Sequence, residues 1–128
     1  MVHSERGIKK MIKFRFEDLE IWKMAIEIAD ELFNIADKLE DNHLYRFAEQ
    51  LRASGMSMSN NISEGSASDS NKELSRYLDI AKKSTFENAN ILIILNRRNL
   101  IGEDDKNDLL ERLDNLCRKI MKFKRSLK

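Results

Sequence analysis

The residues best suited to binding or catalysis lie in one polar stretch, residues 50–65, which is rich in Ser, Asn and Gly. That composition is typical of a loop. However, apolar residues recur every three or four positions through the stretch, and this spacing predicts a helix with one apolar stripe. Such a helix can hold hydrogen-bonding side chains beside a buried seam. The predicted stripe consists of Leu44, Phe47, Leu51, Gly55, Met58 and Ile62.

Polar residues of this helix and of the helix expected after it are candidates for an interior hydrogen-bond network. These candidates are Ser57, Asn61, Glu64, Ser84 and Glu87. We expect Asn61 and Glu64 to face Ser84 and Glu87 and to act through structure, because buried polar networks specify how helices pack. A catalytic role would need a nucleophile with a positioned base, and the only histidine in either predicted helix is His43, in a first turn.

The chain lacks the residue patterns that metal-dependent and hydrolytic enzymes usually carry. Di-iron bundles need Glu-x-x-His pairs on facing helices, whereas the only histidines are His3 and His43 and neither follows a Glu by three positions. No glycine-rich phosphate loop, nucleophile elbow or His-Glu-x-x-His pattern occurs. The single cysteine, Cys117, excludes an internal disulfide and a cysteine-rich zinc site. We therefore expect no metal ion, no cofactor, no small-molecule substrate and no enzymatic activity.

Long helices are expected to position the polar residues. The 128 residues include no proline, and proline breaks helix interiors. Apolar periodicity and capping residues predict helices over about 18–39, 43–65, 70–98 and 103–126. Short connections make successive helices antiparallel. The predicted fold is therefore all-α: an antiparallel up-down-up-down four-helix bundle over residues 16–128, preceded by a basic N-terminal arm over residues 1–15.

The expected location of the protein is the cytoplasm. No run of eighteen uncharged apolar residues occurs, so no segment is expected to span a membrane. Residues 1–13 lack the apolar core of a secretory signal. A single cysteine also fits a reducing compartment.

The net charge of +1 conceals two basic clusters. Residues 1–15 hold five Lys or Arg and one acid, residues 118–128 hold six and no acid, and the chain between them carries a net charge of −9. Both termini of an up-down bundle lie at one end, so we expect one basic end and one acidic end. The candidate nucleic-acid ligands are Lys9, Lys10, Lys13, Arg15, Arg118, Lys119, Lys122, Lys124 and Arg125. Compensation of helix dipoles is the alternative explanation for this clustering.

Several isoleucines lie outside the main apolar stripes of the predicted helices. They are Ile21, Ile28, Ile35, Ile91, Ile93 and Ile94. A monomeric bundle that exposed them would carry apolar patches, and such patches usually mark interfaces. We therefore expect self-association.

Short motifs are distributed along most of the chain. They are Phe16-Glu17-Asp18-Leu19 with Trp22 and Ala25, Gln50-Leu51-Arg52, Ser57-Met58, Asn61-Ile62-Ser63-Glu64-Gly65, Lys72-Glu73-Leu74, Tyr77-Leu78, Ile80-Ala81, Ser84 and Glu87. In these motifs the chain resembles a bacterial four-helix-bundle family encoded in intervening sequences of large-subunit (23S) ribosomal RNA genes. That family is similar to the accessory variability proteins of diversity-generating retroelements.

The resemblance implies an antiparallel bundle that assembles as a ring, commonly a homopentamer, with no known catalysis. It assigns Gln50, Arg52 and Gly65, together with the polar candidates above, to a structural motif. It also implies contact with nucleic acid and with a reverse transcriptase, as in the retroelement relatives.

The sequence thus predicts a non-enzymatic, oligomeric accessory or scaffold protein that contacts RNA, DNA or a nucleic-acid-processing partner through its basic end. The alternative is a purely structural, self-assembling protein without a nucleic-acid role. The sequence alone does not separate the two hypotheses.

Overall fold

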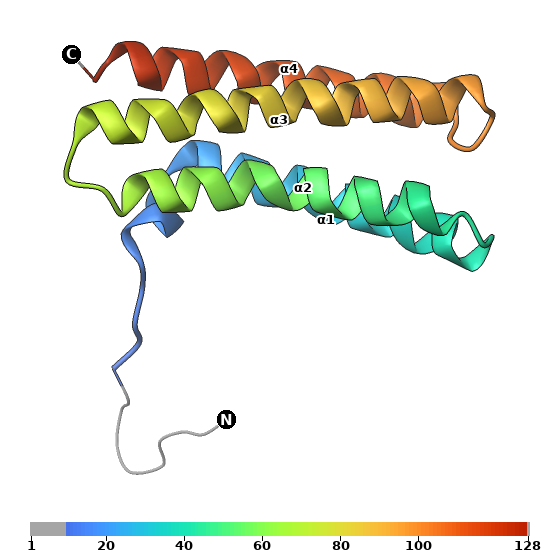
Figure 1. Cartoon of the computed structure of the whole chain (residues 1–128), viewed down its shortest axis with the longest axis horizontal. Coiled ribbons are helices and arrows are strands. Elements are labelled where there is room, and N and C mark those ends of the chain that lie inside the picture. Colours follow the sequence, from blue (N-terminus) through green and yellow to red (C-terminus); the bar gives the residue numbers. More distant parts are fainter. Residues whose placement is uncertain (1–9, 128) are drawn as a thin grey trace.

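Four long helices make up most of the computed structural model, which describes residues 10–127 (Figure 1). A short 3-10 turn, η1 (Arg15–Asp18), precedes α1 (Glu20–Asp41), α2 (Tyr45–Ser66), α3 (Asn71–Arg97) and α4 (Glu103–Arg125). Each helix begins and ends within two residues of the expected boundary. The described residues contain no strand, so the predicted all-α fold is confirmed.

Successive helices run antiparallel, as short connections require. Helix α2 packs on both α1 and α3, α3 also packs on α4, and α1 meets α4 to close the bundle (Figure 1). The N-terminal arm, the α2–α3 turn and the end of α4 share one end of the bundle, and the other two turns share the opposite end (Figure 1). This is the predicted up-down-up-down arrangement.

Local chemistry fixes where the helices begin and end. The Ser70 hydroxyl accepts a hydrogen bond of 3.2 Å from the backbone N–H of Glu73, which caps α3 as expected. His43 and Asn99 adopt left-handed conformations, with φ of 66° and 61°, and terminate α1 and α3. Both residue types tolerate that region better than most. Because His43 is used in this turn, it is not part of α2 as expected, and α2 begins at Tyr45.

One apolar core runs the length of the bundle and buries more of these isoleucines than the sequence pattern predicts. Ile21, Ile28 and Ile91 are buried, Ile35 is half-buried, and only Ile93 and Ile94 are exposed. The expectation of exposed surplus isoleucines is therefore wrong for most of the set. The physical reason is that a bundle helix buries a face at least about 100° wide, broader than a single stripe.

Helices α2 and α3 approach closely at Gly65, in the last turn of α2. A Cβ atom at this position would lie 2.8 Å from Cβ of Tyr77 and 2.9 Å from Cδ1 of Leu74. Carbon atoms do not approach so closely without displacement. Glycine at this position therefore sets the distance between the two helices beside their connecting turn.

We expect Gly65→Ala to lower the free energy of unfolding by about 1–2 kcal/mol, because overpacking costs about 1–3 kcal/mol and exceeds the gain in helix propensity. The matched control is Gly55→Ala in the same helix, whose new Cβ would meet only side-chain atoms, Leu32 Cδ1 being nearest at 3.3 Å. Urea unfolding at equal protein concentration measures both changes. Equal losses for the two variants would contradict this account of Gly65.

Candidate functional site

The centre of the α2–α3 seam holds a fully buried amide, Asn88. Its Nδ2 donates to the carbonyl oxygens of Ser54 and Ser84, both at 2.9 Å. Its Oδ1 accepts from the Ser54 hydroxyl at 2.6 Å. The amide thus satisfies its polar atoms across two helices, as a buried polar group requires. This arrangement ties the register of α2 to that of α3.

A second polar group lies nearer the surface of the same seam. The hydroxyls of Ser57 and Ser84 share a hydrogen bond of 2.8 Å. The amide of Asn61 donates to the carbonyl oxygen of Ser57 at 2.8 Å and to its hydroxyl at 3.1 Å. Ser57 and Ser84 therefore link the helices directly, whereas the hydrogen bonds of Asn61 stay within α2.

The remaining motif residues lie outside this network. Gln50, Glu64 and Glu87 are exposed, so Glu64 and Glu87 do not take part in the interior network expected with Asn61 and Ser84. Arg52 instead joins α2 to the end of α1, with ion pairs of 2.7 Å to Asp37 and 2.6 Å to Glu40. These hydrogen bonds, to Asp37 first and then to Glu40, raise the pKa of Arg52.

Sequence reasoning missed the roles of Asn88 and Ser54 in the network. Asn88 keeps the spacing of the apolar residues of α3, and neither Asn88 nor Ser54 is among the polar candidates named from the sequence. A signal did exist, because an Asn at a core position of one helix needs a polar partner on its neighbour. The Ser-rich composition of α2 supplies that partner.

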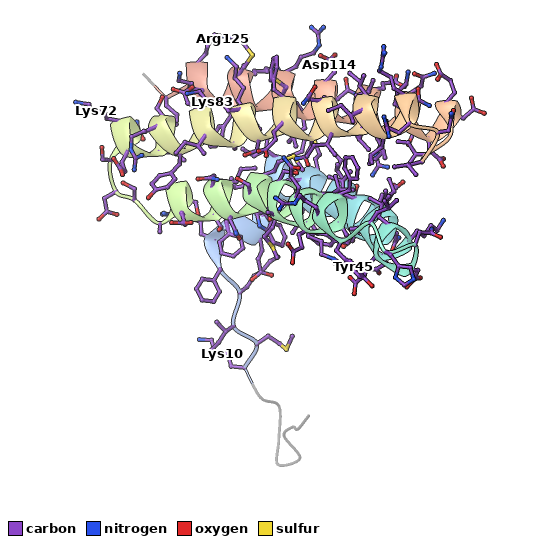
Figure 2. All side chains as sticks on the ribbon, turned by 45° about the vertical axis from the view of Figure 1, so that its right-hand side comes forward. Lys10, Tyr45, Lys72, Lys83, Asp114 and Arg125 are labelled. Atoms are coloured by element: carbon purple, nitrogen blue, oxygen red, sulfur yellow. The ribbon has the colours of Figure 1, made fainter. Side chains whose placement is uncertain are left out.

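The basic candidates gather at the end that carries the arm and the last turns of α4. Figure 2 shows Lys72 and Arg125 toward this end and Tyr45 toward the other. Lys10, Lys13 and Arg15 belong to the arm and η1, whereas α4 contributes Arg118, Lys119, Lys122, Lys124 and Arg125. Lys9 lies outside the described residues.

Carboxylates from several helices neutralise much of this basic cluster. Lys13 pairs with Asp18 at 2.7 Å, Lys119 with Glu20 at 3.2 Å and Lys124 with Asp79 at 2.7 Å. Another pair, at 2.8 Å, joins two residues one turn apart, Arg118 and Asp114. Arg15 donates to the carbonyl oxygen of Ser66.

Among the five candidate cations on α4, two form no ion pair with a carboxylate of the described residues. Within residues 10–127, no carboxylate oxygen lies within 4.0 Å of the charged atoms of Lys122 or Arg125. Both side chains are exposed.

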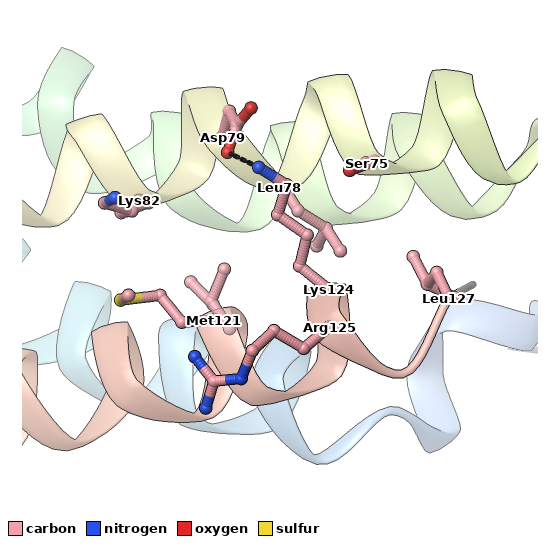
Figure 3. A pocket seen from close by; sticks show the side chains of 9 residues that line it. Ser75, Leu78, Asp79, Lys82, Met121, Lys124, Arg125 and Leu127 are labelled. Atoms are coloured by element: carbon pink, nitrogen blue, oxygen red, sulfur yellow. Dashed lines mark hydrogen bonds and ion pairs between the residues drawn. The ribbon is translucent and has the colours of Figure 1, made fainter.

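A surface groove opens beside Arg125, between α3 and α4 (Figure 3). It has a volume of about 340 Å³ and an apolar floor that includes Leu78 and Ile120. Lys82, Lys124 and Arg125 are among the residues that line it. The groove therefore offers cations beside an apolar surface.

The opposite end carries mixed charge. Six acids lie at this end: Asp37, Glu40, Asp41, Glu103, Asp104 and Asp105. However, Lys38, Arg46, Arg97 and Arg98 share it. The expected acidic end therefore also carries cations, although the six acids outnumber them.

Within residues 10–127, no group of three or more His, Cys, Asp or Glu side chains is arranged to hold a metal ion. No helix in that part of the chain has the length and hydropathy to cross a membrane.

We expect Asn88→Ala to lower the free energy of unfolding by about 2 kcal/mol or more, because it leaves a small cavity and removes hydrogen bonds between two helices. The matched control is Asn61→Ala, which removes only contacts within one helix. Its expected cost is about 0.5 kcal/mol. Equilibrium unfolding in urea at one fixed protein concentration measures both. A loss at Asn61 as large as that at Asn88 would refute the central role of the buried amide.

Comparison with known proteins places the sequence in a family. A family model described as 23S rRNA-intervening sequence protein matches residues 17–122. A solved structure from Bacteroides thetaiotaomicron, described as a protein with unknown function from the S23 ribosomal protein family, shares the fold with a TM-score of 0.77 and 20% identity. The match covers 82% of this chain and 95% of that one. No curated protein matches significantly. Because the family model spans most of the sequence, the chain belongs to the family of 23S rRNA-intervening sequence proteins.

Proposed function

We propose that the protein is a non-enzymatic, oligomeric scaffold that contacts RNA or DNA through the cationic end of α4. The observation that carries this proposal is the pair Lys122 and Arg125. Both are exposed in the last turns of α4, and no carboxylate of residues 10–127 lies within 4.0 Å of their charged atoms. Phosphate oxygens are natural partners for such cations.

Neighbouring ion pairs add to this capacity for binding phosphate. Lys119 and Lys124 pair with Glu20 and Asp79, and all four side chains are substantially exposed. Exposed ion pairs contribute only about 0–1 kcal/mol. A polyanion can therefore displace the carboxylates at small cost and recruit both lysines beside Lys122 and Arg125. The expected ligand chemistry is a phosphate backbone, recognised without base sequence.

Self-association is the second part of the proposal. Phe86 on α3 is 64% exposed and Ile93 is 41% exposed. Exposed apolar side chains of this size favour burial against a partner. We infer a homo-oligomer and, from the family resemblance, a ring of five. In a ring the α4 ends of all copies lie on one face, which multiplies the cationic surface.

The proposed biological role is that of an accessory protein to a nucleic-acid-processing partner such as a reverse transcriptase. A single cysteine fits work in the cytoplasm. A purely structural assembly is the competing function, and nucleic-acid titration separates the two.

We expect wild-type protein to bind single-stranded RNA at low salt with micromolar affinity and to lose affinity as salt rises, because bound cations release counterions. The variant Lys122→Glu with Arg125→Glu should bind about tenfold more weakly and should reduce the magnitude of the salt slope by about one to two. The control, Arg97→Glu with Arg98→Glu, makes the same charge change at the other end and should bind like wild type. Fluorescence anisotropy at several salt concentrations measures all three.

Two results would count against the nucleic-acid role. One is no binding by wild type at about 100 μM, a concentration within or above the nonspecific range. The other is an equal loss of affinity in both charge-reversal variants, which would indicate a dependence on net charge alone. Either result would favour the structural function.

We also expect light scattering after size exclusion to give a mass well above the 15.0 kDa of one chain. The ring of five predicts about 75 kDa, five times the chain mass. Burial of exposed apolar area drives the association. A mass of one chain at micromolar concentration would overturn this part of the proposal without affecting the titration.

A further inference from the structure

An apolar groove lies on the outer face of α3 and α4. Seven residues line it: Thr85, Phe86, Ala89, Leu110, Leu113, Asp114 and Cys117. Its volume is about 170 Å³. The α3 side carries little charge, since Glu87 is the only charged residue in residues 84–96. The groove is therefore suited to receive apolar side chains.

The N-terminal arm carries large apolar side chains that stay mostly exposed. Met11 is 88% exposed, Ile12 is 84% exposed and Phe14 is 63% exposed. The arm leaves the body of the molecule on the side of α1 and α2 (Figure 1). Large apolar residues in an extended segment cost solvation free energy unless another surface covers them.

The charges of the arm and the groove are complementary. Residues 10–16 contain Lys10, Lys13 and Arg15 and no acid. The first half of α4, residues 103–114, contains six acids and two bases. Glu111 and Asp114 are both exposed on this helix. Asp114 forms an ion pair with Arg118, but exposed ion pairs contribute little free energy, so a lysine of the arm can replace Arg118 as the partner of Asp114.

The arm of one molecule is held away from the groove of the same molecule. Arg15 binds the carbonyl oxygen of Ser66, and the ring of Phe16 lies 5.2 Å from the ring of Trp22, which fixes the root of the arm on α1 and α2. Figure 2 shows Lys10 and Asp114 on opposite sides of the bundle. Residues 10–14 span at most about 18 Å when extended. Two stacked helices are about 20 Å across, so these five residues cannot pass around the bundle to the groove.

We propose that Met11, Ile12 and Phe14 of one copy pack into the α3–α4 groove of a neighbouring copy. Lys10 and Lys13 then lie near Glu111 and Asp114 of that copy. The inference rests on self-association but not on nucleic-acid binding. Because the arm and the groove are different surfaces, the contact is heterologous, and a contact of this kind forms a ring where the rotation between copies closes.

The natural Cys117 provides a direct test, since it lines the groove and is the only cysteine in the chain. A tagged chain carrying Ile12→Cys and Cys117→Ser is mixed with untagged wild type and treated with a mild oxidant. Only a disulfide between position 12 of one copy and Cys117 of another gives a band of tagged plus untagged size. The control chain replaces Ile12→Cys with Tyr45→Cys, at an exposed site at the other end.

We expect the mixed band to be about fivefold or more stronger with Ile12→Cys than with Tyr45→Cys, because a disulfide forms only when two Cβ atoms come within about 4.5 Å. Equal bands for the two chains would overturn the proposal. So would an internal disulfide that forms at high dilution in a chain carrying Ile12→Cys and the natural Cys117, since that result places the arm in the groove of its own molecule.

A second variant tests the assembly without a cysteine. Met11→Asp with Ile12→Asp should reduce the mass measured by light scattering while leaving the helical circular dichroism unchanged, because these residues lie outside the core. An assembly of unchanged mass would refute docking by the arm while self-association itself stands. A monomeric wild type would instead refute self-association and the arm proposal together.

Discussion

The α2–α3 seam is the constraint on which the rest of the structure depends. A buried amide without partners would cost several kcal/mol, so Asn88 of α3 must meet Ser54 of α2 in one register. Gly65 then allows the helices to stay close up to their connecting turn. Helices α1 and α4 pack on either side of this pair. That register sets how the ends of α2 and α3 align.

The helices could be predicted because their signals are periodic and local. Helix α2 is the clearest case, since Leu51, Met58 and Ile62 keep helical spacing through a polar composition and are all buried in the structure. Periodicity identifies a face, but it does not identify hydrogen-bond partners. Those depend on the offset and rotation between two helices, which no local pattern encodes. For this reason the candidate network included the exposed Glu64 and left out Ser54 and the role of Asn88.

The distribution of charge also depends on how the helices pack, which the local sequence pattern does not encode. Counting charges along the sequence predicts two opposed ends. In the structure, Lys119 meets Glu20 from α1 and Lys124 meets Asp79 from α3, so segregation along the chain becomes partial neutralisation in space. The cations that matter for a polyanion are those whose neighbours on adjacent helices are not carboxylates. Within the described part of the chain, Lys122 and Arg125 have no carboxylate oxygen within 4.0 Å of their charged atoms.

Assembly through the arm changes which cations can serve a nucleic acid. The arm begins at the same end of the bundle as the last turns of α4 but leaves it on the side of α1 and α2, so in a single copy Lys10 and Lys13 lie apart from the cations of α4 (Figures 1 and 2). If the arm docks on α3 and α4 of a neighbour, these two lysines move to the acidic first half of that α4 and are neutralised there. The phosphate-binding surface then consists mainly of residues from α4. Docking of the arm and binding of a polyanion to its lysines therefore compete. High concentrations of nucleic acid should weaken the contact between copies. They should affect the fold of each bundle less, because the core of the bundle contains none of these charges.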